Sequence, residues 1–110
     1  MLSRTKYIDI GKDSNVKGGL SVLITEGEAY YDANGNNGYS GFCTQTRGAY
    51  LNAKSQMPVG TITHCGDSQS AWAACAQEFS DISKAYCVDS LGSIIEKTLD
   101  CSTFSSTVCQ

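Results

Sequence analysis

The sequence predicts an α+β fold in which one N-terminal amphipathic helix packs on a small antiparallel sheet of three or four strands. Three observations support this prediction. Apolar residues recur at helical spacing in the first third of the chain, the spacing changes to two residues in the second half, and six cysteines follow the helical part. With 110 residues the chain is long enough for one small core. We therefore expect a single domain over residues 1–110 that disulfide bonds stabilise.

The helix is expected over about residues 14–31, with Asp13 or Ser14 as its N-cap. Gly18 and Gly19 each cost about 1 kcal/mol relative to alanine inside a helix. This helix therefore needs tertiary packing in order to be stable. Its apolar stripe consists of Val16, Leu20, Leu23, Gly27 and the pair Tyr30 and Tyr31.

A variable loop is expected over residues 32–70. Its first ten residues are rich in Asn, Asp and Gly, which favour turns because they tolerate positive φ. Residues 46–56 can form a short helix before Pro58, and residues 59–64 can form a short extended segment.

The sheet is expected over about residues 71–98, with turns at residues 79–83 and 90–92. If the first hairpin pivots at Asp81, then Cys75 and Cys87 lie on one face of the sheet. The opposite face, which we expect to lie against the helix, carries Trp72, Ala74, Ala76, Tyr86 and Val88. Residues 99–110 would then form a C-terminal loop closed by a cysteine.

The distribution of charge argues against two classes of partner. Residues 1–31 carry four basic and four acidic side chains, so the net charge of −3 belongs to residues 32–110. An acidic region with scattered lysines is a poor surface for nucleic acid or for an anionic membrane. No apolar stretch approaches the roughly 20 residues of a membrane-spanning helix. Since six cysteines imply an oxidising compartment, we expect that an export segment has been removed and that Met1 is a start residue.

The six cysteines are interpreted as three disulfide bonds rather than as a zinc site, because no CxxC pair occurs. Six cysteines allow 15 pairings. Cys75 and Cys87 would face each other across the hairpin, which favours a bridge between them, and a Cys43–Cys65 bridge is compatible with that scheme and with others. The cysteines are Cys43, Cys65, Cys75, Cys87, Cys101 and Cys109.

Asp32, Asn34 and Asn36 match the first oxygen ligands of a calcium loop. The match fails at the sixth position, where Asn37 replaces glycine, and at the twelfth, where Cys43 replaces a bidentate glutamate. One carboxylate is also too little charge for a tight site. A solvated turn is therefore the preferred interpretation, and calcium remains an alternative.

No set of residues in the sequence predicts catalysis. His64 precedes Cys65, but neighbouring residues on an extended segment point to opposite faces, and we expect the cysteine to be oxidised. Trp72 and Tyr86 are interpreted as core residues rather than as a ligand-stacking platform. The tail is expected to be a polar surface loop, with O-linked sugar as the alternative; its hydroxyl residues are Ser102, Thr103, Ser105, Ser106 and Thr107. We therefore expect no enzyme activity and no cofactor.

The order of these segments resembles the globular half of a type IV pilin or pilin-like protein. The resemblance rests on residues 20–31 with Cys43, on Ala71-Trp72-Ala73, on residues 86–92 (YCVDSLG) and on Cys109. It covers about a third of the chain and implies that a hydrophobic helix precedes this head. The processing site and helix-start glutamate of the family are absent from this sequence. The family's habit of closing its C-terminal loop implies a Cys87–Cys109 bridge, which would leave Cys75 for Cys101.

The resemblance implies a structural subunit of an extracellular, cell-surface filament, anchored in the inner membrane before assembly through the removed helix. The implied partners are other copies or sister pilins, with a surface or host glycan as a further possibility, and no nucleic acid. The exposed edges of the 32–65 loop and of the 101–109 tail would make the contacts. The alternatives are a minor pilin or pseudopilin that acts as a binding module in adhesion, DNA uptake or type II secretion, and a secreted cysteine-rich enzyme or inhibitor.

Overall fold

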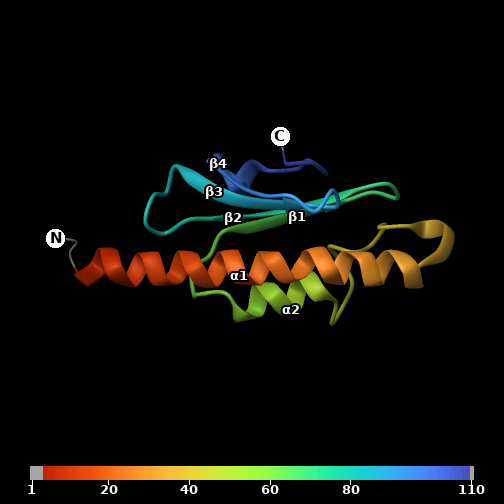
Figure 1. Cartoon of the computed structure of the whole chain (residues 1–110), viewed down its shortest axis with the longest axis horizontal. Coiled ribbons are helices and arrows are strands. Elements are labelled where there is room, and N and C mark those ends of the chain that lie inside the picture. The colour runs from red at the N-terminus through yellow and green to blue at the C-terminus, as the bar shows by residue number, and fades with distance from the viewer. Residues whose placement is uncertain (1–3, 110) are drawn as a thin grey trace.

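The computed structural model describes residues 4–109 and has the predicted α+β architecture (Figure 1). A long N-terminal helix lies along one face of a four-stranded antiparallel sheet, and a short second helix lies alongside it. The strands pair in chain order, β1-β2-β3-β4, so the sheet is a simple meander. The elements are α1 (Arg4–Ala33), the 3₁₀ helix η1 (Gly35–Asn37), α2 (Ala49–Gln56), β1 (Thr63–Asp67), β2 (Trp72–Gln77), β3 (Lys84–Asp89), β4 (Ile94–Thr98) and the 3₁₀ helix η2 (Cys101–Thr103).

The first helix is longer than predicted, because it begins at Arg4 rather than near residue 14. The prediction of Asp13 or Ser14 as the N-cap is therefore wrong. Asp13 lies inside the helix and is buried, and its carboxylate accepts hydrogen bonds from the backbone N–H of Phe79 (2.6 Å) and of Ser80 (3.3 Å). Lys6 Nζ donates to the Ser80 carbonyl at 2.7 Å. The turn between β2 and β3 thus stabilises the early part of the helix.

The segment predicted as a variable loop contains two regular elements. The predicted short helix is present as α2, three residues shorter at its start. The extended segment is shifted toward the C-terminus and forms strand β1, which pairs with β2. The sheet therefore begins at Thr63 rather than near residue 71. The Thr63 hydroxyl, which donates to the Cys75 carbonyl at 2.7 Å, adds a side-chain link to this pairing.

The predicted register of the first hairpin is confirmed. Cys75 lies opposite Cys87, as required if the hairpin pivots at Asp81. The face that carries Trp72 packs against α1, and Val16, Leu20, Leu23 and Gly27 of the helix stripe are buried there. At the end of the stripe Tyr30 is half-buried, and Tyr31 is 44% exposed. The buried side chains of this core include Val16, Leu20, Leu23, Phe42, Trp72, Ala74, Ala76 and Val88.

Helix and sheet are in close contact at Gly27. A Cβ atom added at this glycine would lie 2.6 Å from Nε1 of Trp72 and about 3.0–3.1 Å from the neighbouring ring carbons. Trp72 itself is 1% exposed, so its ring has no free volume into which it can move. The glycine therefore sets the distance between α1 and the sheet.

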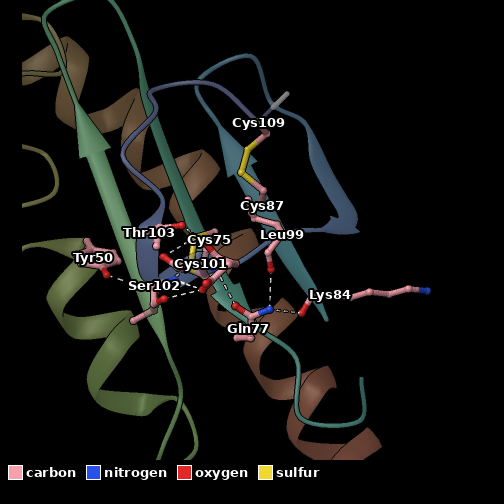
Figure 2. Close-up of a disulfide and its surroundings, with 12 residues drawn as sticks. Tyr50, Cys75, Gln77, Lys84, Cys87, Leu99, Cys101, Ser102, Thr103 and Cys109 are labelled. Carbon is pink, nitrogen blue, oxygen red and sulfur yellow. Dashed lines mark hydrogen bonds between the residues drawn. A yellow bond between two sulfur atoms is a disulfide. The ribbon is translucent and has the colours of Figure 1, made fainter. Parts of the chain in front are cut away.

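The second face of the sheet is covered by the C-terminal segment, which two disulfide bonds attach to it (Figure 2). The bonds are Cys75–Cys101 and Cys87–Cys109, and the third joins Cys43 to Cys65. The pairing implied by the pilin resemblance is thus confirmed, and the alternative Cys75–Cys87 bridge is wrong. Both of these side chains project toward the C-terminal segment, and each meets a cysteine there.

Gln77 connects the C-terminal segment to the end of the sheet through hydrogen bonds (Figure 2). Its side chain is buried, and its Nε2 donates to the carbonyls of Ile82 (3.0 Å), Lys84 (2.9 Å) and Leu99 (2.7 Å). Its Oε1 accepts from the backbone N–H of Cys101 at 2.8 Å. One side chain therefore satisfies four backbone groups where the β2–β3 turn meets the C-terminal segment.

Candidate functional site

The predicted calcium-loop residues lie at the C-terminal end of α1 and in η1. Asp32 is exposed in the last turn of the helix. The amide of Asn34 donates to the carbonyls of Gly38 (2.9 Å) and Ser40 (3.2 Å), so it stabilises the turn that follows. Asn36 contributes its backbone carbonyl to a hydrogen bond from the Gln69 side chain. Within residues 4–109, no three or more His, Cys, Asp or Glu side chains are grouped so as to hold a metal ion.

The other sequence candidates lie apart from one another. His64 is exposed on β1, and Cys65 beside it is bonded to Cys43, so no thiolate is present next to the histidine. Trp72 is in the core, where its ring contacts that of Phe42 with centroids 4.8 Å apart. Tyr86 is half-buried, and Lys17 Nζ lies 5.7 Å from its ring centroid.

A buried carboxyl group, which the sequence interpretation missed, lies between the helix and the sheet. Glu78 is 5% exposed, and its Oε2 has no hydrogen-bond partner within the described part of the chain. Burial, together with a hydrogen bond to Glu96 and the charges of Glu96 and Asp13, raises the pKa of Glu78 to about 7, against the opposing charge of Lys84. The two-residue alternation of β2, continued by two residues, would have placed Glu78 on the helix-facing side of the sheet.

The surface of the molecule has a groove between the two helices. This α1–α2 groove has a volume of about 590 Å³ and lies along residues 15–26 of α1. Gly18, Gly19 and Val22 of α1 line it, together with Ala53 and Met57 from α2 and its C-terminal end. Polar side chains complete the lining: Asn15, Glu26, Arg47, Asn52 and Gln56. A second hollow of about 620 Å³ lies at one end of the sheet beside Ile62, Ile82 and Leu99.

The side of α1 that faces away from the sheet carries exposed apolar residues. Ile8 is 51% exposed and Val22 is 57% exposed, and no atom lies within 4 Å of a Cβ placed on Gly11 or Gly18. These positions recur every three or four residues, so they form one stripe along the helix. We call this stripe the outer face of α1; it consists of Arg4, Ile8, Gly11, Asn15, Gly18, Val22 and Glu26. The sequence prediction did not identify this face, because it considered only the apolar residues that the core would bury.

No helix among residues 4–109 combines the length and the apolar character that crossing a membrane requires. Comparison with protein-family models, with curated proteins and with solved structures finds no significant match to this chain. The candidate site is therefore defined by surface geometry alone: an open groove, and an exposed helix face with Asn15 at its centre, apolar residues and glycines on either side, and charged residues at its ends.

Proposed function

We propose that this chain is the head domain of a structural subunit in a type IV pilus-like extracellular filament. The observation that carries the proposal is the geometry of α1. The helix has 30 residues, and its first turns extend past the end of the sheet (Figure 1). Tyr7, Ile8 and Ile10 are 59%, 51% and 41% exposed. A helix that exposes apolar residues at one end suits a head that is attached to further helical packing in an assembly.

The disulfide bonds support a location outside the cell. The three bonds close chain segments with sequence separations of 22, 26 and 22 residues. Loops of this length gain about 3 kcal/mol per bond by restriction of the unfolded state. Such bonds persist in oxidising compartments, which fits a subunit that is held in the inner membrane before assembly and is displayed at the cell surface afterwards.

The partners in this proposal are other copies of the chain or sister pilins. The exposed parts of the 32–65 segment and the 101–109 tail are available for contacts with neighbouring subunits or with a surface glycan. The acidic charge of residues 32–110 disfavours nucleic acid. A minor pilin or pseudopilin that acts as a binding module is the alternative, and it predicts few copies per filament.

Mass spectrometry of filaments sheared from cells that make the protein tests this proposal. After reduction and tryptic digestion, the peptide spanning residues 85–97 should be abundant in the filament fraction and scarce in the culture medium. The peptides at the N-terminal end should continue into a hydrophobic helix. Few copies per filament would favour the binding-module alternative, and a protein found only free in the medium would refute both filament roles.

A further inference from the structure

We infer that the outer face of α1 is a self-association surface, on which a second copy of this chain packs with its α1 running antiparallel. The contact does not depend on the filament proposal, because it uses only the described part of the chain. It assigns one occupant to the α1–α2 groove, namely the first half of the partner's α1.

The groove and the exposed first half of α1 are complementary in shape. α2 has eight residues and lies alongside the second half of α1, so the first half has no helix beside it (Figure 1). An antiparallel partner places its own first half, which carries Ile8 and Gly11, against the groove of the first copy. By symmetry the first copy does the same for the partner. Because each α2 covers only the second half of its own α1, the two short helices do not collide.

The sequence of the outer face is self-complementary about Asn15. In an antiparallel pair centred on this residue, Arg4 of one copy meets Glu26 of the other, because their positions are equally distant from residue 15. Ile8 then meets Val22, and the two asparagines meet each other on the two-fold axis. A single polar residue at such a central position fixes the register of paired helices.

The glycines of this face allow a close approach. Gly11 of one copy lies opposite Gly19 of the other, next to Gly18. Positions 11 and 18 have no neighbouring atom within 4 Å of an added Cβ, and only the flexible Met57 side chain approaches position 19, at 3.4 Å. Glycine is unfavourable inside a helix by about 1 kcal/mol relative to alanine, so three glycines on this side of α1 are costly for an isolated helix. Helix pairing explains them, because small residues let two backbones come together.

The charges on α1 favour pairing rather than the isolated helix. Its first turn has no acidic residue and its last turn has no basic residue, whereas the helix dipole favours the reverse arrangement. Arg4 and Lys6 lie near the N-terminus, and Glu26, Glu28 and Asp32 lie near the C-terminus. In the antiparallel pair each basic end lies beside the partner's acidic end, about 33 Å from its own. The unfavourable arrangement within one helix thus becomes a favourable one between two.

Because the contact is two-fold symmetric, each copy uses the same surface, and assembly through this surface stops at a dimer. This surface therefore does not extend a filament. It joins two heads that point in opposite directions, either as free subunits or as members of two neighbouring assemblies.

Sedimentation equilibrium of the full oxidised chain at low ionic strength tests the inference. A single helix pair with small side chains gives a weak interface, so we expect a monomer–dimer equilibrium with a dissociation constant of roughly 10 µM to 1 mM. Arg4→Glu and Glu26→Arg should each raise the dissociation constant about tenfold, because each change affects two pairs per dimer. The double variant R4E/E26R restores opposite charges and should return to within about threefold of the original value.

Two further variants separate loss of the contact from loss of the fold. Lys54→Glu makes the same change of charge as Arg4→Glu, but Lys54 is an exposed residue of α2 that does not line the groove. This variant should therefore leave the dimer unchanged. Gly18→Leu should abolish the dimer while the melting temperature of the monomer is retained. Arg4→Glu improves the match to the helix dipole, and Glu26 is an exposed residue of α1, so a dimer lost in either variant would not reflect a lost helix. A monomer up to about 1 mM, assembly beyond a dimer, or a double variant that fails to recover would overturn the inference.

Discussion

Replacing Gly27 by alanine tests the close approach of helix and sheet. Alanine normally stabilises a helix relative to glycine by about 1 kcal/mol. At this position the added methyl carbon would lie 2.6 Å from Nε1 of Trp72, well inside van der Waals contact. Because Trp72 is 1% exposed, either the ring or the whole helix must shift by several tenths of an ångström or more.

The two effects have opposite signs, and the steric effect should dominate. Overpacking of a close-packed core costs about 1–3 kcal/mol. After subtraction of the gain in helix propensity, Gly27→Ala should destabilise the fold by up to about 2 kcal/mol. For a domain of this size, that corresponds to a decrease in melting temperature of up to about 12 °C.

Gly18→Ala on the same helix is the matched control. An added Cβ at Gly18 has no neighbouring atom within 4 Å, so only the gain in helix propensity remains. This variant should therefore stabilise the fold by about 0.5–1 kcal/mol. Both variants should be measured by urea unfolding with the disulfides intact, at a protein concentration at which the chain is monomeric. If Gly27→Ala is as stabilising as Gly18→Ala, the proposed role of Gly27 in setting the helix–sheet distance is wrong.

Three further substitutions probe other contacts. Glu78→Gln should remove a pH dependence of stability, because the raised pKa of Glu78 means that the folded state binds the proton more tightly than the unfolded chain does. As pH rises from about 4.5 to about 7, the stability of the original protein relative to the variant should fall by up to about 3 kcal/mol. Equal pH profiles would refute this. Gln77→Leu should cost about 2–4 kcal/mol in urea unfolding, since one buried and three part-buried backbone groups lose a partner. A cost within error of zero would mean that water replaces the amide. Asp67→Ala should speed amide exchange at Gly41 and Cys43, whose N–H groups donate to that carboxylate at 3.0 and 2.9 Å; unchanged exchange at both would contradict the assignment.

The sequence pattern predicted the central packing of the fold well. The two-residue alternation after residue 71 identified the face that packs on the helix, and the pivot at Asp81 gave the register of the β2–β3 hairpin. These features depend on short-range periodicity, which a single sequence displays directly. The two disulfide bonds to the C-terminal segment required the pilin resemblance, because local geometry favoured a bridge between Cys75 and Cys87.

The missed features depend on long-range contacts or lack a local pattern. The start of α1 is stabilised by hydrogen bonds between Asp13 and the turn at Ser80, which are 67 residues apart. Strand β1 has the sequence THCGD, which lacks an apolar alternation, and pairing with β2 gives it its structure. The outer face of α1 escaped notice for a different reason. Its apolar residues are exposed, and a search for buried stripes does not find them.

The positions of the disulfide bonds determine how the domain would respond to a pulling force. All three bonds lie between residues 43 and 109, so none of them includes α1. A force between the two ends would bypass residues 44–64 and 76–100, because the Cys43–Cys65 and Cys75–Cys101 bonds transmit tension across them. Most of the extension, at about 3.3–3.6 Å per residue, must then come from residues 4–43 through the release and unwinding of α1, and residues 65–75 and 101–109 contribute the rest. After the helix has been released, the three disulfide bonds would still hold the strands and the C-terminal segment together. The helix α1 could then fold back onto this sheet when the tension is removed.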